Sequence, residues 1–73
     1  MTKRRQVKHI YEGDFVAQVD VDIIYTDEGW SPYLSLDDAR KLDDVREALR
    51  EGNLRVASQL ARVYKLTPVS LAA

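Results

Sequence analysis

The sequence predicts a small α+β domain in which an N-terminal antiparallel β-hairpin is followed by two helices. Apolar and polar side chains alternate over residues 14–26, a glycine marks a tight turn just before them, and two later segments place apolar residues at helical spacing. With 73 residues, we expect residues 1–73 to form one domain. Because two strands seldom form a stable sheet alone, we expect a second copy of the chain to complete the sheet and give a homodimer.

The first strand and the turn come from the start of the chain. Residues 3–11 are strand-like, and their alternation places Val7, His9 and Tyr11 on one face, which we assign to the apolar side. A Glu-Gly-Asp turn follows, in which Gly13 supplies the positive φ that tight hairpins require. These features predict an antiparallel hairpin.

The second strand is the most regular segment of the chain. Its alternation puts six apolar side chains on one face: Phe15, Ala17, Val19, Val21, Ile23 and Tyr25. Val16 and Ile24 are the exceptions on the other, polar face. A register slip of one residue would expose the six apolar groups, so the register is strongly specified. No proline or second glycine interrupts this strand, and its free edge favours pairing with another chain.

A helix is predicted between Ser35 and Gly52. Ser35 is the expected N-cap, and Asp38, three residues later, is placed to complete a capping box. Gly52 can adopt the left-handed conformation that ends many helices. The apolar face between them carries Ala39, Leu42, Val45, Ala48 and Leu49. We expect this face to pack on the apolar side of the hairpin.

A second helix is predicted over residues 54–66, with Asn53 as its N-cap. Its apolar face includes Leu60, which we expect to be buried with Leu49 where the helices meet the sheet. The opposite face is basic and carries Arg55, Arg62 and Lys65. These three cations are the candidate nucleic-acid-binding residues, together with the basic N-terminus.

Residues 57–71 are similar to the first helix and the turn of a helix-turn-helix. The similarity is carried by Leu-Ala-Arg at 60–62 and Leu-Thr-Pro at 66–68. The turn position that usually holds glycine is Lys65, and the residues after it hold no recognition helix to enter the major groove. A nucleic-acid-binding regulator is therefore the alternative function.

Charge and composition exclude several classes of protein. Eleven Lys and Arg against twelve Asp and Glu give a formal net charge of −1, which argues against wholesale attraction to nucleic acid. The absence of cysteine excludes disulfides and thiolate zinc sites. No apolar run approaches the ~20 residues of a membrane span. The basic residues 3–5 precede a polar segment, unlike a signal peptide, so we expect a cytoplasmic protein that does not bind membranes.

Residues suited to catalysis are scarce. The single histidine, His9, lacks the second His or the Cys that a metal site or a catalytic pair needs. Paired carboxylates suit acid–base work when burial separates their pKa values, whereas Asp20, Asp22 and the acidic pairs at 37–38 and 43–44 are expected to be solvated. The three glycines are isolated and form no phosphate-binding loop. We therefore expect no enzymatic activity, no cofactor and no bound metal.

Two aromatic residues stand beside the start of the first predicted helix. Trp30 and Tyr33 flank Pro32, which disfavours helical conformation in the residue before it. One interpretation is that both rings close one end of the core. The other is that they form an exposed patch that binds a protein partner.

Five segments together resemble a group of short bacterial proteins. They are Tyr-Glu-Gly at 11–13, Val-Asp-Val at 19–21, Gly-Trp-Ser-Pro-Tyr-Leu-Ser at 29–35, Lys-Leu-Asp-Asp-Val-Arg at 41–46 and Leu-Ala-Arg-Val-Tyr at 60–64. Such proteins resemble the antitoxin-like partners of type II toxin–antitoxin pairs. The resemblance implies a small protein-binding module that acts as a homodimer on a protein partner such as a toxin. It carries over no catalytic residue.

Overall fold

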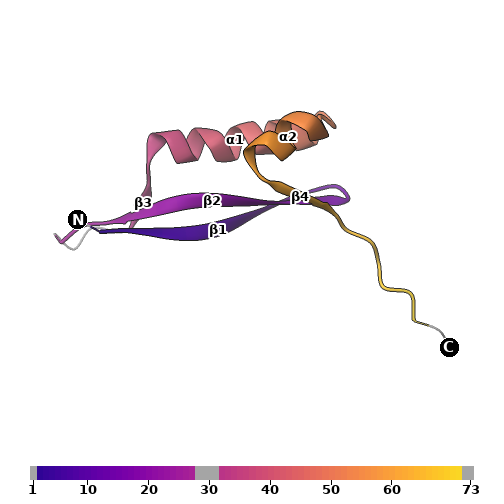
Figure 1. The fold of residues 1–73 in the computed structure, drawn as a ribbon, viewed down its shortest axis with the longest axis horizontal. Coiled ribbons are helices and arrows are strands. Elements are labelled where there is room, and N and C mark those ends of the chain that lie inside the picture. The colour runs from indigo at the N-terminus through magenta and orange to yellow at the C-terminus, as the bar shows by residue number, and fades with distance from the viewer. Residues whose placement is uncertain (1, 28–31, 72–73) are drawn as a thin grey trace.

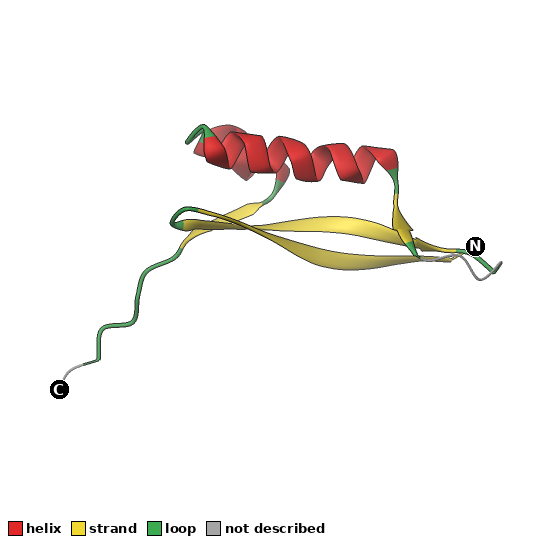
Figure 2. Cartoon of the chain, turned by 180° about the vertical axis from the view of Figure 1, so that it is seen from behind, coloured by secondary structure: helices red, strands yellow, loops and turns green. Residues whose placement is uncertain are grey.

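The computed structural model describes residues 2–27 and 32–71. In chain order the elements are β1 (Thr2–Glu12), β2 (Phe15–Tyr25), β3 (Tyr33–Leu34), α1 (Leu36–Arg50), α2 (Leu54–Leu60) and β4 (Arg62–Lys65). The strands form one sheet, and both helices lie on the same side of it, as Figures 1 and 2 show from opposite directions. The predicted class, an α+β domain with an N-terminal hairpin and two helices, is confirmed.

A two-residue turn joins β1 to β2 and sets their register. Gly13 has a φ of 57°, and no other residue of the turn has a positive φ, which is the pattern of a type II′ turn. Glu12 therefore pairs with Phe15, and the pairing continues to Thr2 opposite Tyr25. As a result, even-numbered residues of β1 share a face with odd-numbered residues of β2.

This register corrects the predicted faces of β1. Ile10 lies opposite Ala17 and is only 5% exposed, so it belongs to the core. Val7, His9 and Tyr11 point to the opposite side of the sheet, which no helix covers. The assignment of these three to the apolar side was wrong, because the turn holds two residues and not the three of Glu-Gly-Asp.

The second edge of β2 is occupied by two short strands of the same chain. β4 pairs with residues 15–18, and β3 pairs with Ile23 and Ile24. Between these two strands, the carboxylate of Asp38 in α1 accepts a hydrogen bond from the backbone N–H of Asp22 at 2.7 Å. The sequence pattern did not predict either of these strands. The expectation that a second chain completes the sheet therefore concerns the outer edge of β1.

The ends of α1 follow the sequence signals, with one difference. The hydroxyl of Ser35 accepts a hydrogen bond from the N–H of Asp38 at 3.1 Å, as an N-cap does. Gly52 has a φ of 74°, and the N–H of Asn53 donates to the carbonyl of Ala48 at 2.8 Å. This bond between residues five apart is one of the two that define a Schellman motif. The difference is that the Asp38 side chain bonds to β2, so it does not complete a capping box.

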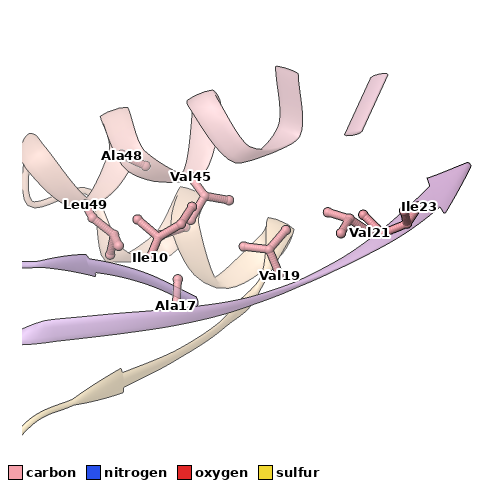
Figure 3. Packing of buried hydrophobic residues seen from close by; sticks show 9 residues of the cluster. Ile10, Ala17, Val19, Val21, Ile23, Val45, Ala48 and Leu49 are labelled. Atoms are coloured by element: carbon pink, nitrogen blue, oxygen red, sulfur yellow. The ribbon is translucent and has the colours of Figure 1, made fainter. Parts of the chain in front are cut away.

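The core lies between the helices and the helix-facing side of β1 and β2, as Figure 3 shows. It consists of Ile10, Ala17, Val19, Val21, Ile23, Val45, Ala48, Leu49 and Ala57. The apolar faces predicted for the second strand and the first helix are confirmed. Leu60 is half-buried at the margin of this core, so the prediction of its full burial was wrong.

α2 is shorter than the sequence predicted. It ends at Leu60, and Ala61 is extended with φ −155° and ψ 171°. The chain then continues as β4, because strand pairing with residues 15–18 satisfies backbone groups on the second edge of β2 that a helix would leave unpaired. The predicted helix over residues 54–66 was therefore wrong beyond Leu60. Residues 66–71, which follow β4, contain no helix or strand, so the likeness to a helix-turn-helix does not extend to the fold.

Candidate protein-binding surface

β1 forms an outer edge of the sheet. Hydrogen bonds on the side of β2 that faces away from β1 show which backbone groups of β1 are free. Asp22 donates its N–H to Asp38, and the carbonyl of Asp14 accepts the N–H of Leu66 at 2.6 Å, so even-numbered residues here point away from β1. Odd-numbered residues of β2 therefore pair with even-numbered residues of β1. The N–H and C=O groups of odd-numbered residues in β1 point outward.

We call this row of outward backbone groups the β1 edge. It is formed by Lys3, Arg5, Val7, His9 and Tyr11. Their side chains lie on the side of the sheet opposite the helices, which we call the open face. Within residues 2–27 and 32–71, no strand pairs with the β1 edge, and β1 contains no proline to interrupt it. The β1 edge can therefore accept a further strand.

The open face is aromatic at the end near the turn. Tyr11, Val16 and Tyr64 form one row across β1, β2 and β4. Val16 is only 8% exposed although no helix covers it, which indicates that its neighbours across the strands shield it. Tyr11 and Tyr64 themselves are 66% and 49% exposed. The ring of His9 stacks on Tyr11 with centroids 6.4 Å apart, so the aromatic surface continues along the β1 edge.

The centre of the open face is a polar network. The guanidinium of Arg62 donates two hydrogen bonds to the carboxylate of Asp20, at 3.0 and 3.1 Å. Its Nε also donates to Gln18 at 3.3 Å, and the amide nitrogen of Gln18 lies 3.4 Å from Nε2 of His9. This network connects β4 to β1 across β2. His9 is thus an exposed, hydrogen-bonded residue, and not part of the apolar side.

The Asp20–Arg62 pair predicts a specific pH dependence of stability. The hydrogen bonds from Arg62 lower the pKa of Asp20 below its ordinary value. A lowered folded-state pKa stabilises the fold above the unfolded pKa, and this contribution is lost as pH falls through the folded pKa. We expect the Tm difference between wild type and Asp20→Asn to be largest near neutral pH and to shrink below about pH 4.

This difference is expected to be small, because both side chains are exposed and solvent screens the pair. Thermal melts of both proteins between pH 7 and pH 3 measure it. Parallel profiles with a constant offset would show that Asp20 titrates alike in the folded and unfolded chains.

The structure separates the residues that the sequence predicted to bind nucleic acid. Arg55 is exposed on α2, whereas Arg62 and Lys65 lie on β4. Arg62 points to the open face, and Lys65 pairs with Phe15 on the helix-facing side. The three residues therefore share no helix face. They were expected on one helix face, but α2 ends at Leu60, before Arg62 and Lys65.

The structure describes one of the two aromatic residues that were predicted to bind a partner. Trp30 lies outside the described residues. Tyr33 pairs with Ile24 and is 48% exposed on the open face, so it does not close the core. The sequence pattern did not identify Tyr11 and Tyr64 as surface residues, although both flank Val16, an exception in the alternation of the second strand.

The other surfaces of the described residues show fewer features of a binding site. A groove between α1 and α2 is lined by three apolar residues, Ala48, Val56 and Leu60, and by four polar or acidic ones: Asp44, Glu47, Glu51 and Asn53. In the described part of the chain, no cluster of three His, Cys, Asp or Glu residues is suited to a metal ion. No described helix is both long and apolar enough to cross a membrane.

Comparisons with protein-family models, with curated proteins and with solved structures gave no significant match. The likeness to antitoxin-like proteins therefore rests on the sequence segments alone. The β1 edge and the open face are the structural features that indicate a function.

Proposed function

We propose that this chain is a small protein-binding module that accepts an extended protein segment at the β1 edge. It acts as a homodimer on a protein partner, in the manner of antitoxin-like proteins. The observation that carries this proposal is the β1 edge itself, whose outward backbone groups have no strand beside them among the described residues. An unpaired edge of this kind is a template for strand addition, in which backbone hydrogen bonds supply affinity and side chains supply specificity.

The small size of the domain supports association. A single layer of helices covers one side of the sheet, and no disulfide supplements the core. Domains of this size bury only ~60% of the surface of their unfolded chain, so association is an available source of further buried surface. Strand addition at the β1 edge supplies that surface without disturbing the helices.

The distribution of charge divides the β1 edge into two halves. Lys3, Arg4 and Arg5 place cations around its first half, and such charges discourage unwanted edge pairing. Val7, His9 and Tyr11 form the second half, next to the aromatic end of the open face, and its single cation, Lys8, belongs to the helix-facing side. Tyrosines are enriched in protein interfaces because each combines a large apolar ring with a polar hydroxyl. We therefore assign strand addition to the second half.

A protein partner fits these surfaces better than nucleic acid does. The cations proposed to bind phosphates lie on two elements, and Arg62 is already bonded to Asp20. Phosphate contacts would need a common basic surface. Exposed backbone groups and tyrosines instead suit a peptide segment.

A proline substitution at Val7 tests the proposal. The N–H of Val7 points outward and has no partner within the described chain, so Val7→Pro is expected to leave the fold intact while removing one donor of the β1 edge. Wild type is expected to have the mass of a dimer at micromolar concentration, and Val7→Pro the mass of one chain. Light scattering after gel filtration measures the masses, and circular dichroism verifies the fold.

Val7→Thr is the matched control. It keeps the backbone N–H and the β-branched shape, so it is expected to remain a dimer. The proposal fails if wild type has the mass of one chain up to millimolar concentration, or if Val7→Pro remains dimeric.

A further inference from the structure

We propose that the segment added to the β1 edge in the free protein is the C-terminal tail of a second copy, residues 66–71, with the exchange made in both directions. This inference rests on the proposed function, because it names the occupant of the same edge. Each subunit would place its tail beside β1 of the other, and the two equal contacts would close a two-fold dimer.

The tail carries the two most exposed large apolar side chains of the described residues, Val69 and Leu71. After β4 it leaves the sheet and runs away from the helices, as the yellow end of the ribbon in Figure 1 shows. Val69 and Leu71 are 84% and 87% exposed, and Leu66 is 45% exposed. Apolar side chains in an unpaired segment gain from being covered. The tail therefore needs a surface that its own subunit does not provide.

Charge favours the tail over a second β1 as the occupant. Two β1 strands side by side would bring together the cations of both copies: Lys3, Arg4, Arg5 and Lys8. Like charges on neighbouring strands repel each other, and antiparallel registers centred on Arg4, Arg5, Gln6 or Lys8 would place two of these cations directly opposite each other, although the register centred on Val7 would not. Residues 66–71 carry no charge, whereas β4 carries Arg62 and Lys65, β2 is paired on both sides and β3 has only two residues. The tail is thus the segment of this chain that can approach the β1 edge without repulsion.

Pro68 determines which way the tail must face. Proline has no backbone N–H, so in an edge strand its nitrogen points to solvent. The backbone groups of Thr67, Val69 and Leu71 then point toward the β1 edge, because these groups alternate along a strand. We place the tail antiparallel to β1, as all strand pairs among the described residues are, and in such a pair residues that exchange hydrogen bonds share a face. Val69 and Leu71 therefore lie on the open face, on the same side of the sheet as Val7.

This placement agrees with the two halves of the β1 edge. Pro68 determines the face of the tail and not its position along β1, and we assign the tail to the second half, where its apolar side chains would meet Val7, His9 and Tyr11 and not Lys3 and Arg5. Val69 and Leu71 would cover Val7, which is 44% exposed in the single chain, and would extend the aromatic end of the open face. The position of one proline and the register of β1 thus lead to the same surface.

Two proline substitutions in the full chain separate this inference from a general effect on the tail. Val69→Pro removes an N–H that would donate to β1, whereas Ser70→Pro removes one that would point to solvent. Both residues lie outside the helices and strands, so neither change is expected to alter the fold of one subunit. We expect Val69→Pro to raise the dimer dissociation constant at least tenfold and Ser70→Pro to change it less than threefold.

Amide hydrogen exchange provides a second measurement on the same proteins. In wild type, the N–H groups of Val7 and His9 are expected to be protected by the tail, and in Val69→Pro they exchange as open edge groups. Protection of Val19, within the sheet, stays unchanged in both. Concentration-dependent mass from sedimentation gives the dissociation constants.

The outcomes distinguish this inference from the proposed function. If Val7→Pro dissociates the dimer but Val69→Pro does not, strand addition at the β1 edge stands and the tail is not the occupant. If Val69→Pro and Ser70→Pro weaken the dimer equally, the directional argument from Pro68 is overturned. If wild type has the mass of one chain throughout, both proposals fail.

Discussion

Replacement of Leu49 by alanine is expected to lower the free energy of unfolding by about 2–5 kcal/mol. Leu49 is 4% exposed and points from α1 toward the sheet, beside Val45 and Ile10, as Figure 3 shows. Removing its side chain leaves a cavity that a core this small cannot easily close. A chain of 73 residues has roughly 4–11 kcal/mol of stability in all, so a large part of it depends on this side chain. Urea denaturation followed by circular dichroism measures the loss.

Two further leucines serve as controls for this prediction. Leu60→Ala is expected to cost less than Leu49→Ala, because Leu60 is half-buried at the margin of the core. Leu36, at the first position of α1, is 66% exposed, and Leu36→Ala is expected to change stability by no more than about 0.5 kcal/mol. If Leu36→Ala and Leu49→Ala cost the same, α1 does not pack with the face that the structure shows.

The local sequence signals predicted most of this fold, and the main error has an identifiable cause. The six alternating apolar residues of β2 and the caps of α1 are local features, and the structure confirms them. The faces of β1 depend instead on the length of the turn. A turn of two residues puts Ile10 opposite Ala17, whereas a turn of three residues would have put His9 opposite Ala17. A difference of one residue in a turn thus reverses both faces of a strand.

The end of α2 could not be predicted from local pattern. Residues 62–65 continue the helical spacing of apolar and basic side chains, so the pattern alone favours one long helix. The structure uses them as β4 because β2 offers unpaired backbone groups nearby, and tertiary pairing overrides the local preference. Ala61 is the residue at which the backbone becomes extended.

The candidate surface was partly visible in the sequence. Val16 and Ile24 break the polar alternation of β2, and each proves to be the buried centre of a row of residues on the open face. Naming the neighbours of Val16, Tyr11 and Tyr64, required the register of β1 and the existence of β4. Neither followed from periodicity, because both are set by contacts between distant parts of the chain.

Val19→Pro is expected to abolish folding of the isolated chain. Val19 is fully buried in the centre of β2, and its N–H points toward β1. Proline would remove this ladder donor, leave its acceptor in β1 without a partner and force a ring into a packed site. These effects act together in a domain with roughly 4–11 kcal/mol of stability in all. Far-ultraviolet circular dichroism and amide exchange at 25 °C measure the effect.

The comparison with Val7→Pro makes this prediction specific to position. Both substitutions replace a strand valine, but the N–H of Val7 points outward from the β1 edge and that of Val19 points into the ladder. Val7→Pro is therefore expected to keep the fold and lose the dimer, whereas Val19→Pro loses both. If Val19→Pro melts at the wild-type temperature, β2 is not the central strand. The alternation of hydrogen bonds that defines the β1 edge would then be reversed, and the proposed site of strand addition would be wrong with it.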